Sequence, residues 1–260
     1  MNEKINLNSK SISVVIPAYN EEKRIGNLLN ELIDYINSNG LNWEIIVSID
    51  GNDGTEEIVK GYSEKFSFIK YDKKSGRNGK GNSIKRVLPL VKNDYVLLMD
   101  ADGSIKFNEI IKNLHYLDSY DAIIFDRYSN HDNDIPLIRR IPSRGFNILV
   151  RILLDIDVRD TQCGFKVIRS DLMRRAFSNV TITSGAYEIA LLYYIKMYGG
   201  KIIEVPVKYT HDKNSKYNVI GLIIGDGATL FAFRIRHSRF YKYIPDWAKK
   251  LYYRKFKSIS

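Results

Sequence analysis

The chain has 260 residues, of which 44% are hydrophobic and 27% charged, and its formal net charge is +10. This composition is ordinary for a globular protein with a sizeable apolar core, so a disordered or fibrous chain is excluded. The single cysteine, Cys163, excludes an internal disulfide and favours a reducing compartment. Residues 1–10 are polar and lack the apolar core of a signal peptide, so we expect a cytoplasmic protein.

The positive charge is concentrated at the C-terminal end of the chain. From Lys216 onward there are ten Lys and Arg residues against two acids, Asp226 and Asp246, so this segment carries +8 of the net +10. Residues 1–215 are nearly balanced in charge. We therefore expect an anionic partner to meet residues 216–260.

Apolar runs and helical apolar faces alternate in the first hundred residues, with short polar turns between them. We predict strands over 11–16, 43–49, 66–71 and 95–99 and helices over 21–35, 55–64 and 81–90. This alternation predicts an α/β fold in which a mostly parallel sheet is covered by helices.

The second half of the chain is less regular but continues the same pattern. We predict strands over 122–125, 164–168 and 201–205 and helices over 145–156 and 186–198. Glu188 lies near the start of the last helix, and the sequence leaves open whether it orients a ligand or caps the helix. No linker interrupts the chain before about residue 215, so we expect one domain over 1–215 and a separate segment over 216–260.

Polar turns over 17–21, 50–54 and 100–104 follow three of the predicted strands. In parallel sheets ligands bind beyond the carboxyl ends of the strands, so these turns are expected to line one crevice. Asp100 and Asp102 leave the end of an apolar strand, where carboxylates need a cation or hydrogen-bond donors. A divalent ion such as Mg²⁺ fits this pair, and a turn or helix-capping pair is the alternative.

These turns resemble, in their order along the chain, the motifs of family 2 glycosyltransferases, which have the GT-A fold. Pro17-Ala-Tyr-Asn-Glu21 resembles the nucleotide-binding turn of that family. Asp50 with Asp53-Gly54-Thr55 resembles its second acidic turn, although it is one residue shorter here. Asp100-Ala-Asp102 resembles its metal-binding motif. The resemblance covers about residues 11–215 and implies a Rossmann-like sheet with helices on both sides.

Four further segments look like those of polyprenyl (dolichyl) phosphate glucosyltransferases, and dolichyl phosphate mannose synthases share most of them. They are Gly79-Lys-Gly81, Asp100–Lys106, Asp160–Lys166 and Glu204–His211 with Ser215-Lys216. The resemblance implies a metal-dependent hexosyltransferase that moves a sugar, glucose from a UDP donor, onto polyprenyl phosphate with inversion. GDP-mannose or UDP-N-acetylglucosamine as donor, and a glycan hydroxyl as acceptor, stay open.

The resemblance also implies roles for the residues of the donor site. Those that would contact the nucleotide-sugar are Pro17, Ala18, Tyr19, Glu21, Asp50, Lys80, Asp100, Ala101 and Asp102. Asp100 and Asp102 would hold Mg²⁺ or Mn²⁺ against the diphosphate. Ser104 stands where mannose synthases carry a metal-facing glutamine, so a third protein ligand stays open.

The acceptor would be a phosphate held by basic side chains, for which the resemblance and the neighbouring sequence offer several candidates. These candidates are Arg127, Arg139, Arg140, Arg144 and Lys216. Each of them could equally be a solvated surface charge. A phosphate acceptor is already ionised at neutral pH, so this reaction needs no strong general base. The catalytic roles then fall to Asp100, Asp102 and Arg127, because a bound cation stabilises the departing diphosphate as a Lewis acid.

Residues 219–233 form an apolar segment that is too short, at 15 residues, for the about 20 that span a bilayer. Basic and aromatic residues follow it to Phe256, as in segments that lie at a membrane interface. One face of helix 145–156, with Phe146, Leu149, Val150 and Leu153, is expected to reach the same interface. The alternative is a core helix with a solvated basic tail. We expect a peripheral protein at the cytoplasmic face of an anionic membrane. A nucleic-acid partner is disfavoured, because acids in the crevice would repel phosphates.

Overall fold

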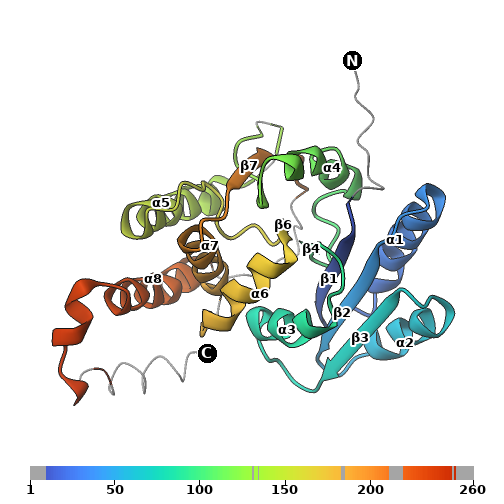
Figure 1. Ribbon diagram of the computed structural model, residues 1–260, viewed down its shortest axis with the longest axis horizontal. Helices are drawn as coiled ribbons and strands as arrows, with labels where there is room; N and C mark the ends of the chain where they lie inside the picture. Colours follow the sequence, from blue (N-terminus) through green and yellow to red (C-terminus); the bar gives the residue numbers. More distant parts are fainter. Residues whose placement is uncertain are drawn as a thin grey trace.

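The structure is a computed structural model of the chain (Figure 1). It describes residues 10–130, 132–133, 135–182, 185–210, 219–247 and 249, without the side chains of residues 139, 219–224 and 240.

A mixed sheet of seven strands forms the centre of the described part of the chain, in the order β3-β2-β1-β4-β6-β5-β7. The strands are β1 Ile12–Tyr19, β2 Glu44–Asp50, β3 Ile69–Lys74, β4 Tyr95–Leu98, β5 Ala122–Asp126, β6 Lys166–Arg169 and β7 Ile202–Pro206. Strand β6 runs antiparallel to its neighbours β4 and β5. The other paired strands are parallel. The prediction of a mostly parallel sheet is therefore confirmed.

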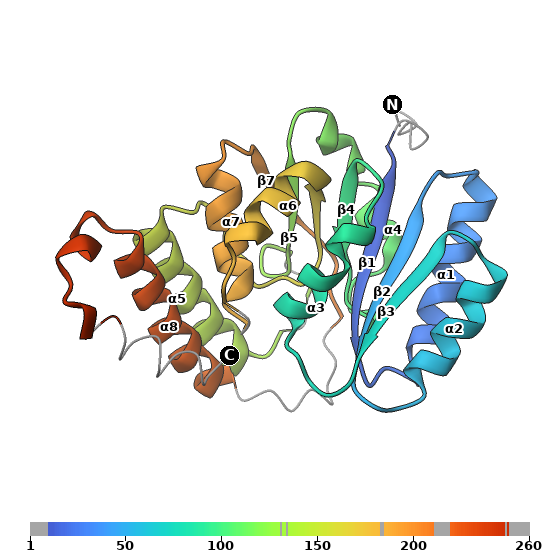
Figure 2. The same cartoon turned by 60° about the horizontal axis from the view of Figure 1, so that its bottom comes forward.

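Helices cover both faces of the sheet (Figures 1 and 2). They are α1 Ile25–Asn39, α2 Thr55–Lys65, α3 Lys80–Val87, α4 Phe107–Ile111, α5 Leu137–Leu154, α6 Ser170–Asn179, α7 Tyr187–Met197 and α8 Val219–Arg236, with short 3₁₀ turns η2 Leu88–Leu90, η3 Leu114–Asp118 and η4 Arg239–Tyr243. Helices α1 and α2 lie at one end of the molecule, whereas α5 and α8 lie side by side at the other end.

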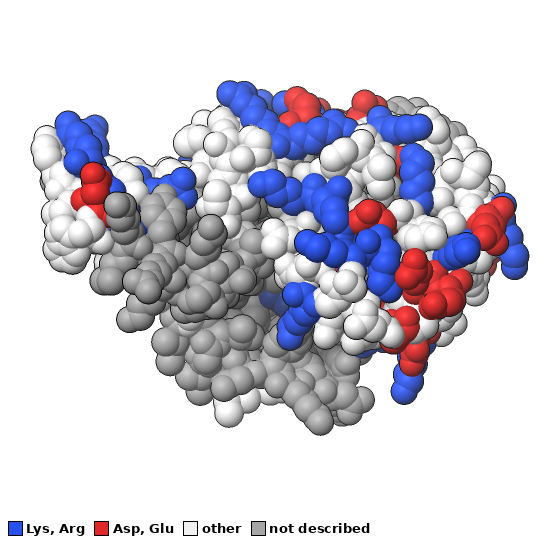
Figure 3. Space-filling model, turned by 90° about the horizontal axis from the view of Figure 1, so that it is seen from below, with Lys and Arg blue, Asp and Glu red and all other residues white. Residues whose placement is uncertain are grey.

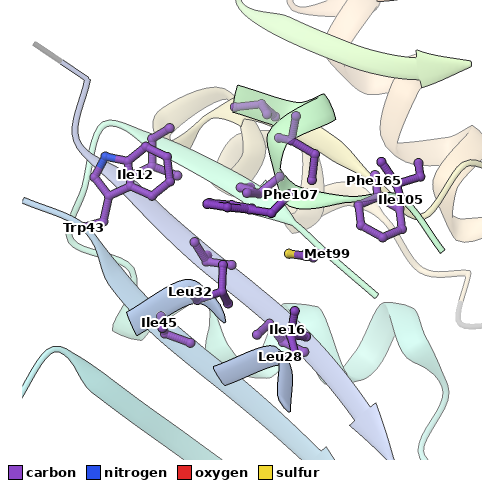
Figure 4. Packing of buried hydrophobic residues seen from close by; sticks show 14 of the residues in the cluster. Ile12, Ile16, Leu28, Leu32, Trp43, Ile45, Met99, Ile105, Phe107 and Phe165 are labelled. Carbon is purple, nitrogen blue, oxygen red and sulfur yellow. The ribbon is translucent and has the colours of Figure 1, made fainter. Parts of the chain in front are cut away.

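The core has two parts, one on each face of the sheet, because successive side chains of a strand point to opposite faces. From β1, Ile12 and Ile16 join the part that contains Leu28 and Leu32 of α1 and Phe107 of α4 (Figure 4). The other part lies under α3, α6 and α7 and takes Val15 from β1. Strand β2 is buried along its whole length, as expected for a parallel strand covered on both faces.

The predicted strands and all the predicted helices are present, with their ends shifted. Helix α5 begins at Leu137 rather than at 145, and Pro142 lies inside it. Helices α4 and α6 were not predicted. None of the described helices combines the length and the apolar content that crossing a bilayer requires.

The expectation about the outward face of α5 was wrong. Phe146 and Val150 are 3% and 0% exposed and belong to the core under α7, and Leu153 packs beside them. The outward face carries Ile148 and Ile152 instead, and Leu149 lies at its border. Apolar residues occur on both sides of this helix, so their periodicity could not tell the buried side from the exposed one.

The sheet places the three predicted turns together. Strand β1 lies between β2 and β4 and is parallel to both of them. The turns over 17–21, 50–54 and 100–104 therefore leave the same edge of the sheet, at the carboxyl ends of adjacent strands. The three turns thus share one edge, as parallel sheets require, and their lining of one crevice stays a prediction.

Candidate functional site

The turns after β1 and β2 are bonded to each other. The backbone N–H of Glu21 donates to Thr55 Oγ1 at 2.8 Å, and that of Glu22 donates to Asp53 Oδ2 at 3.1 Å. Tyr19, at the end of β1, remains exposed, and the Arg77 guanidinium lies over its ring at 5.3 Å. The two turns thus form a fixed rim from which an exposed aromatic ring projects.

Asp50 is buried at the end of β2 and is held by three donors. Its Oδ2 accepts the Asn78 backbone N–H at 3.1 Å and the Ser83 hydroxyl at 2.7 Å. Its Oδ1 accepts an N–H of Arg86 at 3.1 Å. Asp50 therefore fixes the glycine-rich loop of residues 75–81 and the start of α3 against β2.

Asp100, at the end of the β4 strand segment, belongs to a chain of paired charges. The Lys80 ammonium lies 2.6 Å from Asp100 Oδ1 and 3.5 Å from Glu188 Oε1. The other oxygen of Glu188 lies 2.7 Å from the ammonium of Lys166, whose side chain is 0% exposed. The Tyr187 hydroxyl donates to Glu188 Oε1 at 3.0 Å.

These four charged groups, Lys80, Asp100, Glu188 and Lys166, are called the charge chain below. Lys166 and Glu188 are buried, whereas Lys80 and Asp100 are partly exposed, and along the chain two ammonium groups alternate with two carboxylates. Burial alone would lower the pKa of Lys80, but Asp100 and Glu188 raise it well above its usual value. Lys80 is therefore a cation at neutral pH.

Gly164 lies directly against this chain. A Cβ atom at Gly164 would lie 1.9 Å from Asp100 Oδ2 and 2.6 Å from Lys80 Nζ, closer than real Cβ atoms approach other atoms. Glycine is thus required at this position, because the carboxylate and the ammonium occupy the space beside its backbone.

Asp102 differs from Asp100 in its surroundings. Its side chain is exposed, and its Oδ1 accepts the backbone N–H of Ser104 at 3.0 Å. Glu21 lies close to both carboxylates: burial raises its pKa, Arg24 lowers it, and Asp102 and Asp100 raise it further. The negative charges of the two aspartates thus act on Glu21 across the turns after β1 and β4.

The carboxylates of Asp100 and Asp102 offer the oxygen ligands that a hard divalent cation binds. Within the described part of the chain, no three or more His, Cys, Asp or Glu side chains are arranged to hold a metal ion. A cation at Asp100 and Asp102 would therefore complete its coordination with oxygens of a ligand and of water. Mg²⁺ binds in this way, through one or two carboxylates and phosphate oxygens.

Arg127, after β5, is tied to a buried aspartate. Its Nε and Nη2 donate to the two oxygens of Asp160 at 2.7 and 2.8 Å, and its backbone N–H donates at 3.1 Å. The rings of Tyr128 and Tyr209 lie 5.5 and 5.6 Å from the guanidinium carbon. This bidentate pair fixes the plane of the guanidinium group.

Residues 13–177 match the profile described as "Glycosyl transferase family 2". The chain belongs to this family. Among curated proteins it is 31% identical to a dolichyl-phosphate beta-glucosyltransferase of Dictyostelium discoideum, over 87% of this chain and 74% of the relative. It is 28% identical to the Homo sapiens protein of the same name, over 88% of this chain and 76% of that protein.

Solved structures of glycosyltransferases have the same fold. The glucosyl-3-phosphoglycerate synthase of Mycobacterium tuberculosis, solved in complex with Mn²⁺, UDP and phosphoglyceric acid, aligns with a TM-score of 0.64 at 19% identity. The alignment covers 86% of this chain and 78% of that one. The prediction of a GT-A fold is thereby confirmed.

The predicted acceptor residues of this glycosyltransferase are only partly brought together. Arg144 of α5 donates to the Tyr128 carbonyl at 3.4 Å and so lies next to the Arg127 segment. Arg140 is half-buried one turn earlier in the same helix. The side chain of Arg139 and all of Lys216 lie outside the described residues.

Several residues of the site were not assigned a role from the sequence. Glu204 Oε1 accepts the backbone N–H groups of Arg159 and Asp160, both at 2.8 Å, and so holds the loop that presents Asp160 to Arg127. Glu204 also lines a hollow of about 340 Å³ with Asp126 and Arg159. Cys163, by contrast, is buried, and burial raises its pKa to about 12, so its thiol stays protonated.

Substitution of Gly164 tests the contact with the charge chain. Gly164→Ala must displace Asp100 or Lys80, so we expect the kcat/KM of sugar transfer to fall by about a hundredfold or more. Gly61→Ala is the matched control, because nothing lies within 4 Å of the added methyl group. Circular dichroism verifies that both variants are folded. A folded Gly164→Ala enzyme with full activity would contradict this account of the site.

The raised pKa of Glu204 predicts that the stability of the fold depends on pH. Burial, together with the charges of Asp126 and Asp160, raises its pKa from 4.5 to about 7, against the hydrogen bonds that lower it. The folded state thus keeps a proton that the unfolded chain releases, and this stabilisation, full below pH 4.5, is lost as pH rises through about 7.

We expect Glu204→Gln to flatten the decrease of the free energy of unfolding between pH 5 and 7, measured by urea denaturation. Glu57→Gln, at an exposed position of α2, is expected to keep the slope of the unaltered protein. Equal slopes for Glu204→Gln and the unaltered protein would show that Glu204 does not titrate in this range.

Proposed function

We propose that this family 2 glycosyltransferase transfers glucose from UDP-glucose to a polyprenyl (dolichyl) phosphate, with inversion at the anomeric carbon. The relatives named dolichyl-phosphate beta-glucosyltransferases support both the sugar and the acceptor. The observation that carries the proposal is the exposed Asp102 beside Asp100, which Lys80 holds at the carboxyl edge of the sheet. Together these groups suit a diphosphate and its cation.

In this proposal Asp100 and Asp102 hold Mg²⁺ or Mn²⁺. Asp102 offers the accessible carboxylate, whereas Asp100 shares its charge with Lys80. When bound, the ion stabilises the negative charge that builds on the departing diphosphate. The Lys80 ammonium adds a fixed positive charge on the same side and needs no reorganisation during the reaction.

The turn after β1 forms the nucleotide end of the donor site. Tyr19 presents an exposed ring beside Arg77, and Ala18 and Ala101 pack beneath the rim. Pro17 lies near the end of β1 and Glu21 in the turn that follows, and Asp50 fixes the loop that contains Asn78. The flat Tyr19 ring suits a nucleobase or ribose, because aromatic side chains combine a large contact area with few rotatable bonds.

Arg127 and the basic residues near it form the acceptor end of the site. Because Asp160 fixes its guanidinium, Arg127 is preorganised to present its remaining N–H groups to a phosphate. Arg144 lies next to this segment, and Arg140 and Lys216 are assigned the same role. A phosphate acceptor attacks as an anion, so the site needs to position it and does not need a general base.

We place the reaction at the cytoplasmic face of a membrane, with residues 1–215 as the catalytic domain and residues 216–260 as the membrane-interface segment. The +8 charge of that segment supports the assignment, because each basic residue near an anionic leaflet contributes about 1 kcal/mol. A polyprenyl phosphate is itself confined to a bilayer, so an enzyme that uses it must work at the surface.

A transfer assay with labelled donors tests the proposal. We expect glucose to pass from UDP-glucose to a short-chain polyprenyl phosphate in the presence of Mn²⁺ or Mg²⁺, and EDTA to abolish the transfer. Asp102→Asn is expected to lower kcat by about 10²- to 10³-fold, because charge stabilisation at the diphosphate is lost. Asp118→Asn, at an exposed site paired with Lys10, is the matched control and keeps activity.

Other outcomes of this assay would contradict the proposal. Transfer from GDP-mannose or UDP-N-acetylglucosamine alone would refute the assigned donor. Transfer to sugar hydroxyls, with none to the lipid phosphate, would refute the assigned acceptor. Full activity of Asp102→Asn would remove the role given to the aspartate pair.

A further inference from the structure

Glu204 of β7 acts on Arg127 through the segment that carries Asp160. Its Oε1 accepts the backbone N–H groups of Arg159 and Asp160, both at 2.8 Å. Asp160 is fully buried, and its carboxylate in turn accepts the Nε and Nη2 groups of Arg127 at 2.7 and 2.8 Å. The glutamate thus holds the residue that fixes the plane of the guanidinium group.

Asp126 of β5 holds the segment on the other side of Arg127. Its Oδ1 accepts the backbone N–H of Tyr128 at 2.7 Å, and its Oδ2 accepts the hydroxyl group of Ser129. Arg127 therefore lies between two backbone segments, each of which is fixed by a carboxyl group.

The two carboxyl groups point to the same face of the sheet. Strands β5 and β7 are paired with Ile124 opposite Glu204 and Asp126 opposite Pro206. Residues two apart along a strand share a face, so Asp126 and Glu204 are diagonal neighbours on it. Both of them line the hollow of about 340 Å³.

Burial distinguishes the carboxyl groups around Glu204 from those of the surface. In Figure 3, most of the acidic side chains on the face shown gather toward the end that carries α1 and α2, where water screens their charges. Asp126 and Asp160 are only 1% and 0% exposed. Charges at such positions interact through a lower effective dielectric constant, so their neighbours respond more strongly to them.

The charged groups that face Glu204 belong to two neighbouring segments, because β7 itself has no other charged residue. They are Asp126 of β5 and Asp157, Arg159 and Asp160 of the segment after α5. Asp160 is paired with Arg127, and the exposed Asp157 is paired with Arg151 at 2.7 Å. Arg159 is exposed, so water screens its charge.

These surroundings bring the ionisation of Glu204 close to neutral pH. Burial, followed by the charges of Asp126 and Asp160, raises the pKa of Glu204 to about 7, against the two backbone hydrogen bonds that lower it. The hollow has room for several water molecules, which give the carboxyl group access to protons.

The two forms of Glu204 differ in charge more than in hydrogen bonding. A carboxyl oxygen accepts N–H groups in both forms, so Glu204 can hold the segment that carries Asp160 throughout the titration. The ionised form, however, adds a negative charge near the pair of Arg127 and Asp160. This charge offsets the attraction of the guanidinium group for an incoming anion.

We propose that Glu204 is a positioning residue for Arg127 and that its ionisation weakens the binding of the acceptor phosphate. The inference rests on the proposed function, which assigns Arg127 to the acceptor. The neutral form of Glu204 is the one that favours acceptor binding. The donor end of the site lies on other strands, at Asp100 and Asp102, so donor binding does not depend on this titration.

Steady-state kinetics at pH 6, 7 and 8 test the charge effect. The substrates are UDP-glucose and a short-chain polyprenyl phosphate, and Glu204→Gln is compared with the unaltered enzyme. The acceptor phosphate titrates in the same range, so the two enzymes are compared as a ratio of KM values at each pH. We expect the acceptor KM of the unaltered enzyme to equal that of Glu204→Gln at pH 6 and to exceed it about fivefold at pH 8. The ratios for kcat and for the donor KM are expected to stay constant.

Two further variants separate positioning from charge. Glu204→Ala removes the acceptor of both N–H groups, so we expect its acceptor KM to rise about tenfold at every pH, whereas Glu204→Gln keeps the pH 6 value of the unaltered enzyme. Glu57→Gln, at an exposed position of α2, is the matched control and keeps the pH profile of the unaltered enzyme. Circular dichroism at each pH verifies that the variants are folded.

A ratio of acceptor KM values that stays the same from pH 6 to pH 8 would overturn the inference. So would an equal change in the donor and acceptor KM values, because Glu204 would then act on the fold as a whole.

Calorimetric titration with the same polyprenyl phosphate, without donor, separates this inference from the proposed function. Binding that weakens from pH 6 to pH 8 in the unaltered protein more than in Glu204→Gln, without any transfer of glucose, would refute the function and leave the inference standing. Transfer of glucose with the same pH dependence in both proteins would refute the inference and leave the function standing.

Discussion

The charge chain from Asp100 through Lys80 and Glu188 to Lys166 is the interaction on which the rest of the site depends. It joins the end of β4 to α3, α7 and β6, elements that come from both halves of the sequence. Glu188 and Lys166 are the buried end of the charge chain, and removal of one of these two leaves an uncompensated buried charge, which costs about 3–5 kcal/mol. The charge chain therefore holds Asp100 in place only while Lys80, Glu188 and Lys166 are all present.

Two features of the site follow from this constraint. Asp100 is neutralised by Lys80 and held in place, so the exposed Asp102 is the carboxylate that remains accessible to a cation. Gly164 must stay a glycine, because the paired charges fill the space beside its backbone. Arg127 is fixed in a comparable way, on the side that we propose for the acceptor, by Asp160 and the loop that Glu204 holds. Asp100 and Arg127, at the two ends of the site, are thus each held in place by a salt bridge.

Much of the fold and the location of the site could be predicted from the sequence. Apolar runs that end in polar turns identify the carboxyl ends of β1, β2 and β4, and the rules of parallel sheets bring those ends to one edge. The buried charged residues that hold the site together could not be predicted in this way. Lys166 and Glu188 are charged residues, which composition assigns to the surface, and their burial depends on a pairing between distant segments. The outward face of α5 escaped prediction because both sides of that helix are apolar.

A crystal structure of the enzyme with Mn²⁺ and UDP-glucose tests the central claim most directly. Anomalous scattering locates the metal without reference to the protein. The account predicts one Mn²⁺ held by the carboxylates of Asp100 and Asp102 and by the diphosphate, with Lys80 still next to Asp100. A metal bound elsewhere, or a diphosphate far from both aspartates, would contradict the account.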